Sequence, residues 1–131
     1  RLYREAPVNS IWEGSGNVMC LDVLRAIGRT PNIGDVLRVE LDGGDTRLKA
    51  FAKKLLDRLA APERNDEAQA RALVRDLVLG LQAALLIKNA PAAVADAFCA
   101  SRLTGEGGGA FGTLPRELDL RAIVDRATPL N

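Results

Sequence analysis

Apolar residues at helical spacing in residues 45–61 are the feature that most limits how this chain can fold. Leu48, Ala52, Leu55 and Leu59 follow one another at steps of three and four residues. Such steps place apolar side chains on one face of a helix, where they can bury against a core. No stretch of the sequence shows the sustained alternation of apolar and polar residues that a half-buried strand needs. The sequence therefore predicts an all-α fold.

Start and stop signals divide the chain into about five to six helices. Ser15 or Asn17 is suited to begin the first helix, Asp45 to cap the third, and Gly105 to end the fifth. Short connections favour antiparallel neighbours, so the helices are expected to form a bundle. The expected helices comprise residues 15–28, 32–41, 45–61, 65–89, 91–105 and 115–126, with a glycine-rich loop over 105–112.

Several classes of protein are excluded by composition. The 131 residues include no histidine and only two cysteines, Cys20 and Cys99. The commonest metal ligand and general base is thus missing, and two isolated thiols do not make a zinc site. No metal site is expected, and mechanisms of the Cys-His and Ser-His-Asp types are excluded within this chain.

The distribution of apolar residues indicates a cytoplasmic location. No apolar run approaches the length of a membrane span, and no charged segment precedes an apolar run as in a signal peptide. We therefore expect no membrane partner. The chain begins with Arg1 where an initiator methionine would stand, so we expect an internal or truncated start.

The most informative local chemistry is Glu13-Gly14-Ser15-Gly16-Asn17, one carboxylate beside small residues at the start of the first long helix. Gly14 and Gly16 allow close approach by a bulky planar or phosphorylated ligand. The N–H groups of a first helical turn point outward and favour anions such as phosphate. The alternative is that Ser15 to Asn17 only cap the helix, with Glu13 a favourable charge beside the cap.

Residues 11–15, Ile-Trp-Glu-Gly-Ser, resemble the Ile-Tyr-Glu-Gly-Thr signature of acyl-CoA dehydrogenases. The longer run from Arg1 to Arg25 is similar to the alkylation-response branch of that family. The resemblance implies a helical domain of the type found at the C-terminus of these enzymes. Residues 1–30 would hold the glutamate motif, the FAD contacts and the first helix of that domain. Residues 31–131 would form the C-terminal helical extension of the branch.

The resemblance also implies a chemistry. Glu13 would be the catalytic base that removes the α-proton of an acyl-CoA thioester, while FAD accepts hydride from the β-carbon. The cofactor-binding residues would be Gly14, Ser15, Gly16 and Asn17. Trp12 and Ser15 replace the usual Tyr and Thr, a change shared by the branch, which leaves the physiological substrate open. The segment alone is expected to be inactive, because most of the flavin and acyl-CoA pocket belongs to domains that it lacks.

Two alternatives concern the helical extension. Double-stranded DNA binding is implied by the same branch, and the sequence offers a basic cluster suited to contact phosphates on one helix face. The opposing interpretation is an ordinary solvated basic face, since the net charge is only +1. The second alternative is a bundle for subunit contacts, because the family commonly forms homotetramers. The candidate DNA residues are Arg25, Arg47, Lys49, Lys53, Lys54 and Arg58.

Overall fold

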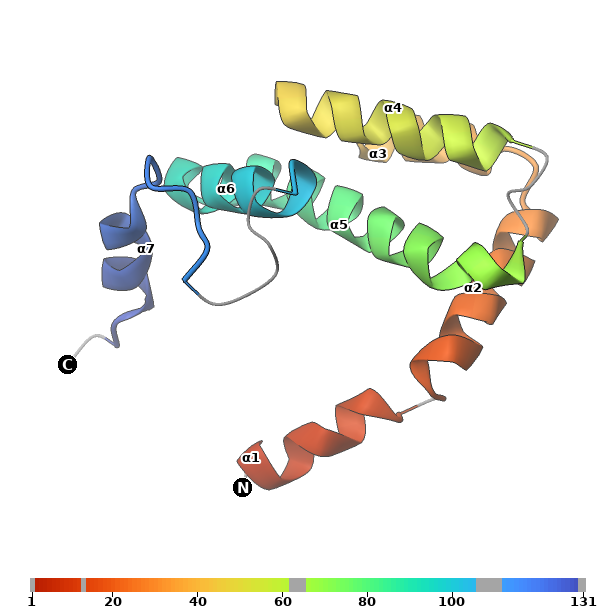
Figure 1. The fold of residues 1–131 in the computed structure, drawn as a ribbon, viewed down its shortest axis with the longest axis horizontal. Helices are drawn as coiled ribbons and strands as arrows, with labels where there is room; N and C mark the ends of the chain where they lie inside the picture. The colour runs from red at the N-terminus through yellow and green to blue at the C-terminus, as the bar shows by residue number, and fades with distance from the viewer. Residues whose placement is uncertain (1, 13, 62–65, 106–111, 130–131) are drawn as a thin grey trace.

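A computed structural model describes residues 2–12, 14–61, 66–105 and 112–129. No strand occurs in this part of the chain, so the prediction of an all-α fold is confirmed (Figure 1). The elements in chain order are α1 (Leu2–Glu5), the 3₁₀ helix η1 (Ala6–Ser10), α2 (Gly16–Arg29), α3 (Ile33–Glu40), α4 (Thr46–Ala60), the 3₁₀ helix η3 (Glu67–Gln69), α5 (Ala70–Asn89), α6 (Ala92–Phe98), the π-helical turn η4 (Cys99–Leu103) and α7 (Leu120–Ala127).

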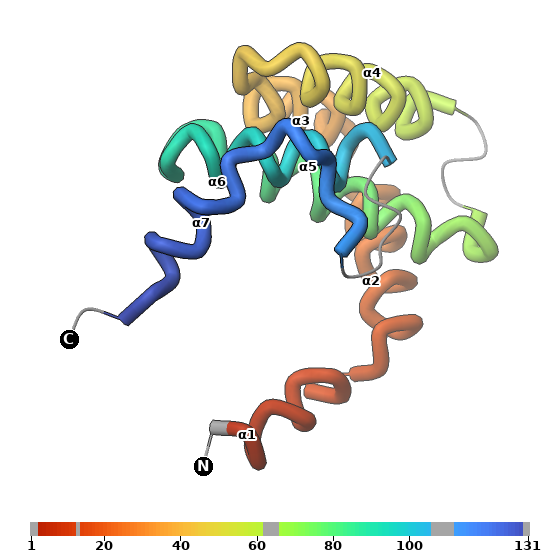
Figure 2. Tube along the Cα trace, turned by 60° about the vertical axis from the view of Figure 1, so that its left-hand side comes forward, coloured from red at the N-terminus to blue at the C-terminus, as the bar shows by residue number. Residues whose placement is uncertain are grey.

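Helix α5 is the element against which the others pack. It contacts α2, α4, α6 and η4. In both overall views α3 and α4 lie on one side of α5, and α2 lies at its N-terminal end (Figure 1 and Figure 2). The segment formed by α1 and η1 projects from α2 away from α4. Helix α5 therefore connects the N-terminal motif with the rest of the bundle.

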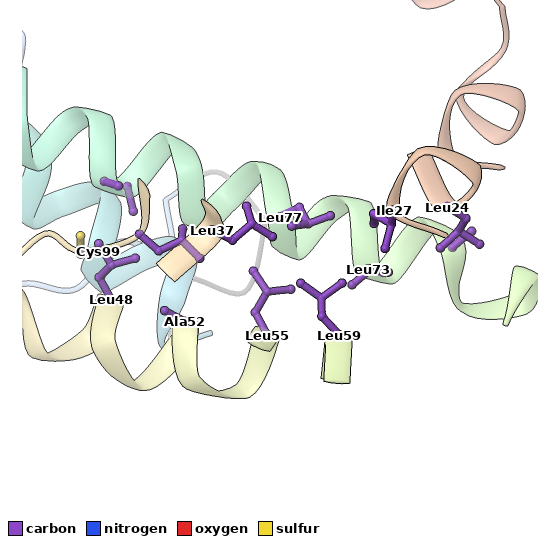
Figure 3. Close-up of a cluster of buried hydrophobic side chains, with 14 residues drawn as sticks. Leu24, Ile27, Leu37, Leu48, Ala52, Leu55, Leu59, Leu73, Leu77 and Cys99 are labelled. Atoms are coloured by element: carbon purple, nitrogen blue, oxygen red, sulfur yellow. The ribbon is translucent and has the colours of Figure 1, made fainter. Parts of the chain in front are cut away.

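The hydrophobic core lies between α4 and α5 and is closed by α2 and α3. The side chains of Leu55 and Leu59 point from α4 toward α5, where Leu73 and Leu77 meet them (Figure 3). Leu48 and Leu73 are almost completely buried. The expected apolar stripe of α4 is thus confirmed. The buried cluster consists of Leu24, Ile27, Leu37, Leu41, Leu48, Ala52, Leu55, Leu59, Ala70, Leu73, Leu77, Ala83, Ala84 and Cys99.

One glycine inside α5 allows neighbouring side chains to pack closely against the helix. A Cβ atom on Gly80 would lie 3.0 Å from Cδ2 of Leu41 and 3.6 Å from Cε1 of Phe51. Glycine costs about 1 kcal/mol in a helix interior relative to alanine. The position of Gly80 is explained because a side chain there would push α5 away from Phe51 of α4 and from Leu41, which precedes α4.

Aspartates at three helix starts satisfy backbone N–H groups. Asp45 accepts hydrogen bonds from the N–H groups of Arg47 at 2.8 Å and Leu48 at 3.4 Å, as its expected role as a cap requires. Asp66 caps η3 in the same way. The last helix begins at Leu120 rather than near 115, because Asp119 provides its cap. The expected start of this last helix therefore differs from the observed one, because Asp119 was not used as its cap.

Leu24 and Ile27 of α2 belong to the same buried cluster as the leucines of α4 and α5. Residues on both sides of the expected division at residue 30 thus share one core. The division into a motif and an extension stays a prediction about their roles. The short helices α1 and η1 were not expected from the sequence, which has no long apolar period there.

An ionic cluster joins the start of α4 to α6. Arg47 lies 2.7 Å from a carboxylate oxygen of Asp45 and 2.8 Å from one of Asp96. The hydrogen bond from Arg47 lowers the pKa of Asp45, against the opposing effect of burial. Cys99 lies in the neighbouring core, and burial raises the pKa of its thiol. Helix α6 is therefore held to α4 by charge as well as by apolar contact.

Replacing Leu73 with alanine should lower the free energy of unfolding by about 2–5 kcal/mol, because it removes a core side chain and leaves a cavity. Leu85→Ala is the matched control on the same helix. Leu73 is 1% exposed and Leu85 is 57% exposed, so the control should cost far less. Urea titration of both variants measures the difference. Equal losses would contradict the placement of the core on this face of α5.

Replacing Asp45 with alanine should cost about 0.5–2 kcal/mol of stability at neutral pH through loss of the cap. The folded pKa of Asp45 is lowered, so its carboxylate contributes stability above its usual pKa and loses it as pH falls through the folded pKa. The difference between wild type and variant should therefore shrink between roughly pH 5 and pH 2. Asp42→Ala is the control, and denaturant titrations across this pH range are the measurement. A difference that is constant with pH would contradict the assignment.

Candidate functional site

Two residues determine the backbone just before α2. One is a glycine with a positive φ, and the other is a serine at the N-cap position whose hydroxyl group makes no capping hydrogen bond. Gly14 has a φ of +126°, where a residue with a side chain would be strained. Ser15 occupies the N-cap position with extended backbone, but its side chain makes no capping hydrogen bond. The interpretation of Ser15 as only a cap therefore has no support from its hydroxyl group. Glu13, the predicted base, lies outside the described residues.

The first turn of α2 contacts a residue that is distant in the sequence. The Nε–H group of Arg71, near the start of α5, donates a hydrogen bond to Oδ1 of Asn17. A Cβ atom on Gly16 would lie 3.0 Å from Nη2 of Arg71, tighter than ordinary contact. The open space at Gly16, which the sequence suggested was for a ligand, is thus used by this guanidinium group.

An open hollow of about 620 Å³ lies between the start of α2 and α5. Its polar lining includes Arg71 and Arg75, and its apolar lining includes Cys20, Val74 and Val78. The guanidinium of Arg75 lies 2.8 Å from a carboxylate oxygen of Asp76, its neighbour in the chain. Two cations therefore flank an apolar surface beside the residues predicted to contact a cofactor.

The basic residues of α4 do not share one face. Successive helical residues are about 100° apart, which puts Arg47 and Arg58 on one flank and Lys49 and Lys53 on the other. Arg58 lies 3.3 Å from a carboxylate oxygen of Asp76 on α5. Both arginines are thus turned toward α5 and α6 and are paired there. Their contacts support a structural role for these two side chains.

Three lysines of α4 remain exposed to solvent. Lys53 forms an ion pair of 2.6 Å with Asp57, whereas Lys49 and Lys54 have no ion pair within the described part of the chain. Lys49 and Lys53 also line an open groove of about 570 Å³ between α3 and α4. These three lysines remain candidates for DNA contact, which stays a prediction.

Arg25, the remaining DNA candidate, lies on α2. Its guanidinium forms an ion pair with Asp22, one turn earlier on the same helix. Its surroundings include Gly28 and Glu67. Arg25 thus lies on a different helix from the other five candidates, and a carboxylate of its own helix already pairs with it.

Arg71 was not identified from the sequence. It is 54 positions from Asn17, and nothing in its local sequence distinguishes it from the other exposed arginines of the chain. Ala70 beside it is buried, which fixes the backbone of this turn against the core. Only the packing of α2 across α5 brings its guanidinium to the motif.

Part of the apolar surface of α5 is exposed. Val78 is 46% exposed, and Leu85 is more than half exposed. The apolar side chains of α5 are therefore only partly used for the core of this chain. An exposed apolar surface is compatible with subunit contacts, and the oligomerisation hypothesis stays a prediction.

The described residues meet neither the requirements of a metal site nor those of a membrane span. No group of three or more histidine, cysteine, aspartate or glutamate side chains is placed to hold a metal ion there. No helix in the same part of the chain is both long and apolar enough to cross a membrane.

Comparison with known proteins adds one relative. The chain is 40% identical over 111 residues to AidB of Escherichia coli (strain K12), whose name assigns it provisionally to the acyl-CoA dehydrogenases. The match covers 82% of this chain but only 20% of the length of AidB. No family model and no solved structure matches the chain. The chain is therefore similar to AidB over most of its own length, and this similarity and the all-α fold are consistent with a C-terminal segment of an AidB-like protein.

Proposed function

We propose that this segment supplies the catalytic base and part of the FAD contact of an acyl-CoA dehydrogenase-like flavoprotein. The motif from Glu13 to Asn17 carries the proposal, because it joins a carboxylate to the first turn of a helix in an AidB-like chain. The segment spans one fifth of the length of AidB. The reaction therefore belongs to the longer protein, and the segment alone is inactive.

Glu13 acts in this proposal as a general base. Its carboxylate takes the α-proton of an acyl-CoA thioester, while a hydride leaves the β-carbon and the Cα–Cβ double bond of a 2-enoyl thioester forms. Bound FAD supplies the hydride acceptor. The backbone N–H of Glu13 donates to the thioester oxygen, which gains negative charge as the proton leaves. Base and donor thus come from one residue.

The polar groups near α2 suit the anionic part of a dinucleotide. A pyrophosphate carries acceptor oxygens and negative charge, so it requires donors. Ser15 offers a hydroxyl group without a capping bond, and Asn17 offers an amide. The donor set is therefore compatible with FAD, and we assign Gly14, Ser15, Gly16 and Asn17 to its contact.

Replacing Glu13 with glutamine in the full-length protein should slow exchange of the acyl-CoA α-hydrogen with deuterated solvent by about 100-fold or more, because the amide is not a base. Bound FAD should be retained, which the flavin absorbance shows. Glu40→Gln at the exposed end of α3 is the matched control. Exchange at the wild-type rate in the Glu13 variant would remove the residue from its proposed role.

Duplex DNA binding is the second candidate function, favoured by the exposure of Lys49, Lys53 and Lys54 on α4. Such contacts would be made to phosphates, with strong dependence on salt and little dependence on base sequence. The ion pair between Lys53 and Asp57 weakens the candidate, because it places a carboxylate within the same surface.

Replacing these three lysines with alanine should weaken DNA binding and reduce the slope of log affinity against log salt by roughly one unit for each lost phosphate contact. Arg47→Gln is the control, since Arg47 is paired with Asp45 and Asp96 and its loss should affect stability instead. Fluorescence anisotropy at several salt concentrations measures the slope. Absence of salt-dependent binding by the unsubstituted protein would rule out this candidate.

A further inference from the structure

We propose that Arg71 is a positioning residue of the cofactor site, which orients the side-chain amide of Asn17 toward FAD. The inference rests on the proposed function, because it assumes that Asn17 contacts the cofactor. It adds to that function a residue of the helical extension that the glutamate motif does not include. Three features at the crossing of α2 and α5 support this role.

The first observation is the contact between the two side chains. The Nε–H of Arg71 donates a hydrogen bond to Oδ1 of Asn17. A guanidinium group has only donors, so it must face the oxygen of the amide and not its nitrogen. The contact therefore determines which end of the Asn17 amide faces α5.

The second observation concerns the other end of that amide. No acceptor among the described residues engages the nitrogen of Asn17. The NH₂ group carries two donors on the side away from Arg71. An acceptor-rich ligand, such as a phosphate ester, needs donors of this kind. A free Asn17 side chain would sample both orientations, whereas the bonded one presents the nitrogen.

The third observation is that the backbone is adapted to the contact. The absence of a side chain on Gly16 admits the guanidinium, since a Cβ there would lie 3.0 Å from Nη2 of Arg71. Ala70 and Leu73, near Arg71 on α5, are both buried and fix this part of the helix against the core. A group that orients a ligand contact is most effective when it stands on a rigid element. Helix α5 provides that element.

Arg75 distinguishes positioning from simple attraction of anions. It lies one turn further along α5, lines the same hollow and carries the same charge. Its guanidinium is paired with Asp76 and makes no hydrogen bond to Asn17. If charge alone mattered, loss of either arginine would weaken FAD binding similarly. If Arg71 acts through Asn17, only loss of Arg71 weakens FAD binding.

The test measures FAD affinity of the full-length apoprotein for Arg71→Ala, Asn17→Ala, the double variant and Arg75→Ala. We expect each of the first two substitutions to weaken binding roughly tenfold, as for loss of one charge-assisted hydrogen bond. The double variant should be no weaker than Asn17→Ala, because Arg71 acts through that amide. Arg75→Ala should bind as wild type does. Thermal unfolding of each apoprotein shows that the variants fold.

Asn17→Asp gives a second readout that a purely structural role would not change. The aspartate keeps an acceptor for Arg71 and should preserve or raise thermal stability, but it offers no donor. FAD affinity should fall at least as far as in Asn17→Ala. Unchanged affinity of Asn17→Asp, additive losses in the double variant, or equal losses in the two arginine variants would each overturn the positioning role. Unchanged affinity of Asn17→Ala would instead show that the proposed cofactor contact at Asn17 is wrong.

Discussion

Burial of the leucine face of α5 is the interaction on which the rest of the structure depends. Leu73 and Leu77 are covered by leucines of α4 on one side and by α2 at the N-terminal end. Burial of each such side chain contributes about 1.5–3 kcal/mol. Helix α5 contacts α2, α4 and α6. Loss of this face would therefore separate the N-terminal motif from the extension.

The same packing decides what the charged residues do. Helix α4 turns Arg47 and Arg58 toward neighbouring helices, where carboxylates of Asp96 and Asp76 pair with them. Such partly buried pairs mainly favour one arrangement of the helices over others, since ion pairs add little net stability. The side chains left for an external partner are the lysines on the outward part of α4. The number of basic residues along α4 therefore overstates the positively charged surface that is available to DNA.

The crossing of α2 and α5 gives the extension a part in the proposed chemistry. The residues from Gly14 to Asn17 are consecutive and overlap residues 11–15, which carry the resemblance to the acyl-CoA dehydrogenases. Arg71 comes from the other side of the expected division at residue 30, yet it bonds Asn17. In the proposed function, the helical extension therefore contributes to the arrangement of the cofactor site. It supports the first turn of the helix that begins beside the proposed base.

The all-α class, most of the helices and the residues of the glutamate motif can be read from the sequence, because each of these features depends on residues that are close together in the chain. The period of Leu48, Leu55 and Leu59 and the cap at Asp45 act within a few turns of one helix. Tertiary structure alone decided which arginines are paired and that Arg71 meets Asn17, since these contacts join residues far apart in the chain. Helical periodicity states which face of a helix is apolar, but only packing chooses the neighbour that covers it.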